Sequence, residues 1–568
     1  MIMKKTMYRL FTLVAIAASA LFHSCETTEL EILNDPDQLS EDQADPDLLL
    51  NAIQRAYVAN MVTMNDQSSD LTRIDYFFGR TYRENLQSNI FNASWSRFYS
   101  SQILDGIARG ISPNVNILEG LNEDPDTDLS FHLGVAKALQ AHQLMLLVDF
   151  IGDIPFSEAL NPLEFPSPNV DDDAMVYSTA LAMLDESLGF FQASDGAGSA
   201  LDFFYGGDVD NWIALVNTLK MRHALTTGDI GTFNAIVSGG NFISDSSQDF
   251  QFNFGLQELN PDTRHQDYAT DYTTSGANLY QSNWLMETMQ GEDVMDPSDD
   301  DPRIRYYFYR QTDCTPGASC NPDGNGERLS CSLETPPAHY SAQGISFCWL
   351  EDGYWGRDHG DDDGTPPDNF FRTAVGVYPA GGLFDDDQFN ELTLGAGGGG
   401  AGIEPIILAS YVDFWQAEVA LAAGQTGPAA AFVTAGLEKS IAKVQSFIAL
   451  DGSADSSFEP TPAEVTAYIA AQAAKIVDTS DDSWNALAEQ YFITMYGGGS
   501  DAYNFYRRTG YPTTVKPSLN PNPGPFPRTY FYPNVEVVAN PNIQQRPDLT
   551  TQVFWDTNPA SPAFPPAN

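Results

Sequence analysis

The residue types best suited to chemistry in this chain are aromatic rings interleaved with arginines near its start. From Asp70 to Gln87, tyrosine and phenylalanine alternate with arginine and aspartate. Such rings can stack on the C–H faces of a sugar, and the planar donors of arginine can reach its hydroxyls. The candidate ligand contacts are Arg73, Asp75, Tyr76, Tyr82 and Trp95, together with Tyr354 and Trp355, which we expect to be exposed. The alternative is that these side chains pack between helices.

Carboxylates gather in a second stretch, Tyr354–Asp368 (YWGRDHGDDDGTPPD). Oxygen-rich loops beside glycine can hold Ca²⁺, and the candidate ligands are Asp358, Asp361 and Asp363. The EF-hand pattern does not fit, because His359 occupies its first position. A loop held by hydrogen bonds alone is the alternative. We therefore expect that no cofactor is required and that Ca²⁺ is the metal to test.

Four of the five cysteines fall within one segment: Cys314, Cys320, Cys331 and Cys348. An even number of cysteines in a short segment of an exported protein favours disulfides. Three pairings are open, of which we favour Cys314–Cys320 with Cys331–Cys348. A four-cysteine zinc site is the alternative, but the paired spacing that such sites use is missing.

Sequence signatures of the common enzyme classes are absent. No serine has glycine at both −2 and +2, and none of the seven histidines begins H-E-x-x-H. No phosphate-binding loop or dinucleotide fingerprint occurs either. An exported glycoside hydrolase stays open, because 77 acidic residues offer many pairs of carboxylates and the sequence does not give their separation.

Charge excludes one class of partner. The 568 residues include 27 lysines and arginines against 77 aspartates and glutamates, for a net charge of −50. Such a field repels polyanions and no local basic patch offsets it, so nucleic acid is excluded as a partner.

The first residues read as a targeting segment. Three basic residues precede the uncharged run Leu10–Phe22, which has the length of a signal-peptide core and is too short to span a bilayer. Ser24-Cys25 follows it, so we expect residues 1–24 to be a signal peptide and Cys25 to be lipidated after cleavage. Ordinary secretion is the alternative. Residues 25–47, acidic and poor in apolar side chains, would form the lipid anchor and an extended spacer, so that the membrane is reached through the anchor only.

Helical periodicity dominates the rest of the chain. One helix is expected from Trp212, capped by Asp208 or Asp210, with Phe204 and Tyr205 folded over its entrance. Another is expected over Pro405–Leu421, with proline in the first turn. The best division is a single domain, 48–568: a helical scaffold at about 48–229 and 403–510, a loop-rich insert at about 230–402, and an extended tail at 511–568 that wraps over the helices.

Three separated stretches carry a resemblance to a known family. They are Leu147–Ala159 (LVDFIGDIPFSEA), Asp202–His223 (DFFYGGDVDNWIALVNTLKMRH) and Tyr503–Pro512 (YNFYRRTGYP). In this order they resemble the SusD/RagB family of surface glycan-binding lipoproteins, in its SusD-like branch. Asp301-Pro302-Arg303 and Glu418 resemble further signatures of that family.

The resemblance implies a mainly α fold: a tetratricopeptide-like scaffold of helical pairs with a large, irregular, loop-rich insert that faces the ligand. It also implies a surface-exposed lipoprotein of the outer membrane that is not an enzyme. Such a protein captures oligosaccharide and delivers it to a SusC-type TonB-dependent transporter. Two alternatives remain: the same fold with peptide as cargo, and an exported glycoside hydrolase.

Overall fold

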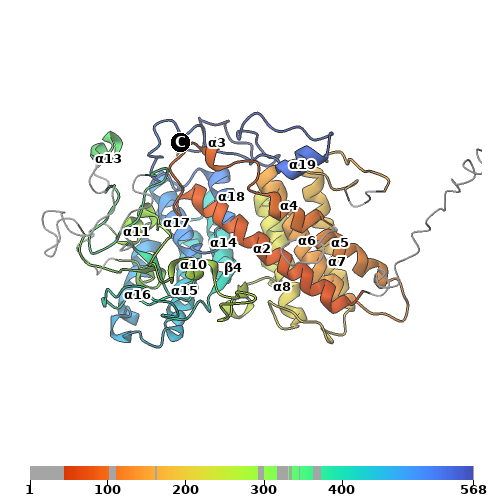
Figure 1. Ribbon diagram of the computed structural model, residues 1–568, viewed down its shortest axis with the longest axis horizontal. Coiled ribbons are helices and arrows are strands. Elements are labelled where there is room, and N and C mark those ends of the chain that lie inside the picture. The colour runs from red at the N-terminus through yellow and green to blue at the C-terminus, as the bar shows by residue number, and fades with distance from the viewer. Residues whose placement is uncertain are drawn as a thin grey trace, which may run out of the picture. The chain divides into compact units, whose positions relative to one another are not determined.

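A long helix, α2 (Pro46–Thr72), runs between the two main groups of helices (Figure 1). Pro46 starts it, at the position where a missing N–H costs nothing, and Asp47 lies in its first turn. One face of α2 packs on α4, α5 and α6, and α18 and β4 contact it elsewhere. The computed structural model describes residues 44–100, 110–159, 161, 163–291, 300–315, 331, 335–343, 346–362 and 372–566.

The first group is centred on α6 (Ser130–Ile151), which is apolar all round and buried along nearly its whole length. Helices of that composition occur inside a core rather than on its surface. It pairs with α7 (Asp173–Ala193), and α8 (Val209–Thr227) and α9 (Ile230–Gly239) form the next pair. In the second group α14 (Ala409–Ala422) pairs with α15 (Thr426–Ser446). These stacked pairs are the expected tetratricopeptide-like scaffold, and the mainly α fold class is confirmed.

The other helices are shorter. They are α3 Tyr82–Asn85, α4 Asn92–Tyr99, α5 Ile111–Leu121, α10 Gln266–Asp271, α11 Asn283–Met289, α12 Ile304–Tyr307, α13 Ala338–Gln343, α16 Pro462–Ala474, α17 Asp481–Thr494, α18 Ser500–Thr509 and α19 Asn534–Ala539.

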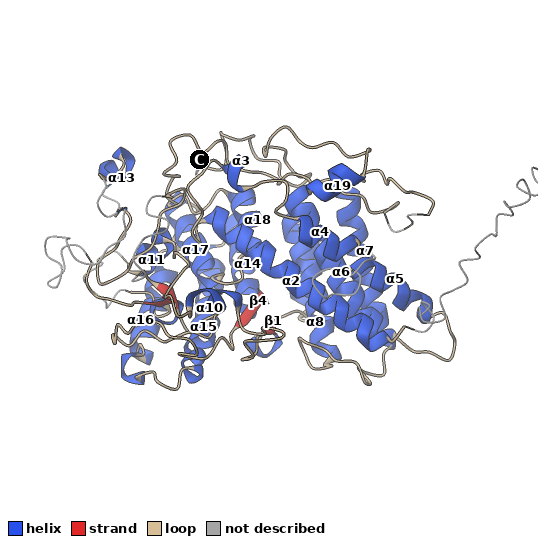
Figure 2. Cartoon of the chain, viewed as in Figure 1, coloured by secondary structure: helices blue, strands red, loops and turns tan. Residues whose placement is uncertain are grey.

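Strands are few and short (Figure 2). β1 (Phe250–Asn253) pairs antiparallel with β4 (Ile403–Ile407), and β2 (Phe308–Tyr309) pairs antiparallel with β3 (Ala374–Val375). The helix predicted from Pro405 therefore begins later. Pro405 lies in β4 and α14 starts at Ala409. The five-residue strand is buried throughout, so its apolar run could equally have been the start of a helix.

The start of α8 is as predicted. Asp208 caps it by accepting the backbone N–H groups of Asp210 and Asn211 at 3.0 and 3.1 Å. Tyr205 and Phe204 lie edge-on against Trp212, so the entrance of the helix is covered by rings. The helix continues to Thr227, where Gly228 ends it in the left-handed conformation.

The C-terminal segment closes over the first group of helices. The backbone N–H of Tyr530 donates to the carbonyl of Phe150 at 2.7 Å, and Trp555 Nε1 donates to Oδ1 of Asp149 at 3.0 Å. Asp149 is fully buried and also accepts from Tyr177, Arg222 and Asn504. A single carboxylate thus joins α6, α7, α8, α18 and the tail.

Cys331 and Cys348 form a disulfide, which confirms that part of the predicted pairing. Cys314 is also disulfide-bonded, and Cys320 lies outside the described residues, as do Cys25 and the signal segment. Pro46–Asn568 make up one compact unit. None of the helices in the described ranges is both long and apolar enough to cross a membrane.

Candidate functional site

A cavity of about 290 Å³ lies at the C-terminal end of α2. Its walls come from segments far apart in sequence: the last turns of α2, the turn that follows, the start of α10, and the loops before α11 and α18. The lining residues are Asn65, Asp66, Gln67, Ser69, Asp70, Asp75, Tyr76, Gln266, Asp267, Leu279, Tyr280, Gln281, Val375, Pro379, Tyr496 and Gly497.

Four of these lining side chains are carboxylates: Asp66, Asp70, Asp75 and Asp267. Burial raises the pKa of each, and the neighbouring carboxylates raise the pKa of Asp66, Asp70 and Asp75 further. The pKa is raised to about 7 for Asp75 and to about 6 for Asp267. The cavity therefore gathers four acidic side chains, several of which hold a proton near neutral pH.

A fifth carboxylate, Glu404 of β4, lies behind the wall. It is 1% exposed, and Asn65 Nδ2 donates to its Oε1 at 2.6 Å. Burial raises the pKa of Glu404 to about 8, and the charges of Asp267 and Asp75 add to this effect. Hydrogen bonds from the side chains of Asn65 and Gln266 offset part of this rise in pKa.

Tyrosines supply the aromatic part of the wall. The rings of Tyr76 and Tyr280 meet edge to face with centroids 5.6 Å apart. Tyr280 is held by two guanidinium groups, those of Arg357 and Arg372, at 4.3 and 3.9 Å from its ring centroid. Gly497 has a φ of +82° and lies close to Pro379, another residue of the cavity lining. A Cβ at this position would meet the Pro379 ring at 2.3 Å, so only glycine fits. The wall around the cavity is thus closely packed at Tyr280 and at Gly497.

Of the predicted ligand contacts, Asp75 and Tyr76 line this cavity. Arg73 is adjacent in sequence but is 1% exposed, and its guanidinium donates to the carbonyls of Leu71 and Lys516 at 2.6 and 3.1 Å. Tyr82 is buried beside His359, and Trp95 is buried and donates to Glu536. These three side chains therefore pack inside the fold, which was the alternative, and do not line the cavity.

The expectation that Tyr354 and Trp355 are exposed is wrong. They are 4% and 1% exposed. The guanidinium of Arg310 lies 5.0 Å from the ring centroid of Tyr354, and Trp355 packs against the disulfide of Cys331 and Cys348. Tyr354 and Trp355 are thus covered by the disulfide, whose Cys348 lies nearby in sequence, and by Arg310, which is distant in sequence.

Two of the three calcium candidates are engaged by other groups. Asp358 is buried and accepts from Asn283, from the backbone of Cys348 and from Lys516. Asp361 forms an ion pair with Arg357 at 3.3 Å. Asp363 lies outside the described residues. Within the described ranges, no group of three or more histidine, cysteine, aspartate or glutamate side chains is arranged to hold a metal ion.

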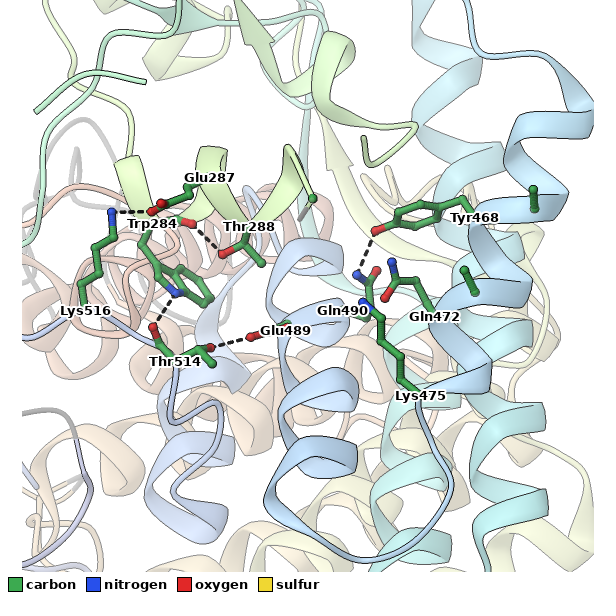
Figure 3. A pocket seen from close by; sticks show the side chains of 13 residues that line it. Trp284, Glu287, Thr288, Tyr468, Gln472, Lys475, Glu489, Gln490, Thr514 and Lys516 are labelled. Carbon is green, nitrogen blue, oxygen red and sulfur yellow. Dashed lines mark hydrogen bonds and ion pairs between the residues drawn. The ribbon is translucent and has the colours of Figure 1, made fainter. Parts of the chain in front are cut away.

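A larger cavity, of about 690 Å³, opens between α11, α16 and α17 (Figure 3). Its polar side chains largely bind one another: Lys516 pairs with Glu287 at 2.5 Å, Trp284 donates to the carbonyl of Thr514, and Gln490 donates to Tyr468. No predicted site residue lines it. The smaller cavity is the better candidate site because its carboxylates are not paired with cations.

Sequence reasoning missed Asp66, Asp70 and Asp267. A signal for the first two exists: they lie four residues apart in the last two turns of α2, where no basic residue balances them. The carbonyl end of a helix disfavours anions, and like charges at this spacing repel. Such a placement indicates a role other than helix stability. Asp267 has no comparable signal, because only the fold brings it to α2.

Comparison with known proteins gives consistent matches. Residues 36–352 match the model of a family described as "Starch-binding associating with outer membrane", and residues 404–546 match one described as "Susd and RagB outer membrane lipoprotein". A search of curated proteins finds no match.

Solved structures share the fold at low identity. A SusD homolog from Bacteroides uniformis is 17% identical over 90% of this chain and 99% of its own, with a TM-score of 0.56. A SusD/RagB family protein from Bacteroides thetaiotaomicron is 17% identical over 92% and 100%, with a TM-score of 0.59. A chitin-binding SusD homolog from Flavobacterium johnsoniae is 15% identical over 90% and 99%, with a TM-score of 0.55.

Proposed function

Because this chain belongs to the SusD/RagB family of outer-membrane lipoproteins, we propose that it captures oligosaccharide at the cell surface and delivers it to a SusC-type TonB-dependent transporter. The observation that carries the proposal is the cavity at the end of α2, in which tyrosine rings stand beside amide and carboxylate side chains. These are the groups that recognise the C–H faces and the hydroxyls of a sugar.

The volume of the cavity suits a short piece of a glycan. At about 290 Å³ it lies at the lower limit of small-molecule sites, so one or two sugar rings would enter while the rest of the chain stays outside. Few contacts per ligand give weak, reversible binding. Weak binding suits a protein that must release its ligand to a transporter.

The anchor and the partner follow from the family. Lipidation at Cys25 would tether the protein to the outer membrane, and the transporter would take up the captured glycan. No cofactor is required in this proposal. Ca²⁺ at the loop of Asp358, Asp361 and Asp363 is a separate proposal, which the binding experiment below tests by including and omitting the ion.

The family consists of binding proteins, so we propose no catalytic step. Hydrolysis of glycan is still worth measuring, because the cavity holds several carboxylates with different pKa values, as glycoside hydrolases do. Peptide cargo is the second outcome to watch for.

The test is a glycan array followed by calorimetry on the mature protein, with and without Ca²⁺. We expect at least one oligosaccharide to bind, and Tyr76→Ala to weaken that binding at least about tenfold, since removing a stacking ring costs about 1.4 kcal/mol or more. The matched control is Lys475→Ala in the larger cavity, which should leave the affinity unchanged. Failure of all glycans to bind, or release of shortened glycan, would contradict the proposal.

A further inference from the structure

We infer that Arg357 is a positioning residue of the proposed glycan site: it holds the rings of Tyr76 and Tyr280 in the wall of the cavity and does not itself line the cavity. The inference rests on the proposed function and deepens it by naming the residue on which the geometry of the two rings depends. Three observations carry it: the backbone pairing around Arg357, the contacts of its guanidinium group, and its burial.

The backbone around Arg357 joins the two segments that carry the tyrosines. Residues 355–362 form this bridging segment, which pairs with each of the two through an isolated β-bridge. The N–H of Arg357 donates to the carbonyl of Gln281 at 2.9 Å. The N–H of Gly360 donates to the carbonyl of Phe77, also at 2.9 Å. Because Gln281 and Phe77 each directly follow one of the tyrosines, the bridging segment links the backbone positions of both rings.

The guanidinium of Arg357 makes a second connection, through side chains. Its central carbon lies 4.3 Å from the ring centroid of Tyr280, and its Nη2 donates to the hydroxyl of Tyr280 at 3.3 Å. Its Nη1 forms an ion pair with Oδ2 of Asp361 at 3.3 Å. The backbone carbonyl of Asp361 in turn accepts the hydroxyl of Tyr76. Arg357 thus contacts one ring directly and holds the residue that binds the other.

Burial keeps Arg357 away from a ligand in the cavity. Its side chain is fully buried, whereas Tyr76 and Tyr280 are only partly buried. Of these three residues, only the two tyrosines line the cavity. The effect of Arg357 on the affinity for a neutral glycan is therefore exerted through the two rings.

The bridging segment has anchors of its own. Oδ2 of Asp358 accepts the backbone N–H of Cys348 at 3.0 Å and the Nδ2 of Asn283 at 3.1 Å. Trp355 packs in one apolar cluster with the disulfide of Cys348. Arg357 lies between these two anchored residues, so it is held in place by partners other than the two tyrosines.

The contacts of Arg357 depend on the planar, forked shape of a guanidinium. One of its nitrogens serves the hydroxyl of Tyr280 and another serves the carboxylate of Asp361, while the group lies over the ring. A lysine carries the same charge as a single ammonium on a flexible stem, so it cannot make all three contacts at once. Arg357→Lys therefore keeps the charge and removes the connection between the two rings.

Rings that are already in position raise the affinity for a glycan, because ordering mobile side chains on binding opposes association. The two rings meet edge to face, at an interplanar angle of 62° and with centroids 5.6 Å apart. Without the guanidinium, part of the cost of ordering them falls on the binding step. We expect the affinity of Arg357→Lys for glycan to fall about fivefold or more.

The experiment is a double-mutant cycle, measured by calorimetry on the mature protein. Its probe is the oligosaccharide of the glycan array that the unmodified protein binds most tightly. The four proteins are the unmodified chain, Arg357→Lys, Tyr280→Ala and the variant with both substitutions. We expect the loss caused by Arg357→Lys to shrink to about twofold or less in Tyr280→Ala, because the ring that Arg357 contacts directly is gone. A general structural role would give the same loss in both backgrounds.

The matched control is Arg528→Lys, which makes the same exchange at another fully buried arginine. Arg528 pairs with Asp556 in the C-terminal segment, and its exchange should leave the affinity unchanged. Asp361→Asn is a second test variant: it removes the ion pair with Arg357 and should lower the affinity about twofold or more. Thermal melts check that each variant folds, and Asp361→Asn takes the place of Arg357→Lys if the latter does not.

Unchanged affinity in folded Arg357→Lys, or in Asp361→Asn where it takes that place, would overturn the inference and leave the proposed glycan binding intact. An equal loss in Arg528→Lys would overturn it as well, and so would a loss that Tyr280→Ala does not diminish. If no oligosaccharide binds the unmodified protein, the proposed function itself fails.

Discussion

Asn65 on α2 donates from its Nδ2 to Oε1 of Glu404 on β4 at 2.6 Å. The same amide donates to the carbonyl of Pro405 at 3.2 Å, and its Oδ1 accepts the backbone N–H of Ser500 at 3.0 Å. One side chain therefore ties α2 to β4 and to the start of α18, directly beside the cavity.

Asn65→Ala should consequently destabilise the protein by about 2–3 kcal/mol, because it leaves a buried carboxyl and a buried backbone N–H unpaired. Glu404→Gln should cost less, about 1 kcal/mol or less, because the carboxyl is already largely protonated near neutral pH and the amide keeps the shape of the side chain. Urea unfolding of the two variants would check this order. A larger loss for Glu404→Gln than for Asn65→Ala would contradict the role given to the amide.

Stability should fall as pH rises from 6.5 to 8.5. Burial raises the pKa of Glu404 to about 8 and those of Asp75 and Asp271 to about 7, whereas the unfolded chain holds these carboxyls near their ordinary values. The folded state therefore binds more protons in this range, and the advantage is lost as pH passes the folded pKa values. We expect a loss of about 2–4 kcal/mol.

This pH window also avoids the histidines. Burial lowers the pKa of His142 and of His265. These histidines therefore change the free energy of unfolding only below about pH 6.5, where the unfolded chain binds protons that the folded state does not. Urea titrations at the two pH values measure the change. Glu404→Gln should reduce it by about 1–2 kcal/mol, whereas the exposed Glu123→Gln should leave it as it is.

Asp149→Ala should be among the most destabilising single changes. Asp149 is fully buried and faces Arg222, whose Nη2 lies 3.1 Å from Oδ2. Removing the carboxylate leaves the buried guanidinium with only its longer ion pair to Asp501, at 3.5 Å, and costs about 3–5 kcal/mol. Asp185→Asn is a suitable comparison, because the exposed pair of Asp185 with Lys220 should contribute less than about 1 kcal/mol.

The disulfide between Cys331 and Cys348 closes a loop with a sequence separation of 17. Constraint of a loop of that size in the unfolded chain is worth about 3 kcal/mol. The double variant Cys331→Ser with Cys348→Ser should lower the melting temperature and speed proteolysis of the insert. Equal melting temperatures would show that the bridge adds nothing to the global unfolding equilibrium.

The elements that sequence reasoning identified correctly are those with local signals. Asp208 caps α8 because a short side-chain acceptor followed by an amphipathic run is a local feature. Arg508, in the third stretch that resembles the family, pairs with Glu418 at 2.9 Å. Arg507 differs: its guanidinium donates to the backbone carbonyls of Arg528 and Asp149.

What could not be predicted depends on contacts between distant segments. The pairing of Cys331 with Cys348 was predicted, but not that this disulfide packs against Trp355, nor that Arg310, distant in sequence, lies against Tyr354. The cavity is another case, because Asp70 and Asp267 meet only after α10 has folded against the end of α2. Asp75 and Tyr76 were identified because their residue types suit a ligand, whereas Arg73, of equally suitable type, is used inside the fold.

The position of Trp555 has a consequence for how the chain matures. Its indole completes the set of donors around Asp149, most of whose other partners lie hundreds of residues earlier. During synthesis and export these earlier helices emerge first, before Trp555 is present to donate to Asp149. Final consolidation of the α6 region is thus deferred until nearly the whole polypeptide has crossed, a timing compatible with secretion in an unfolded state.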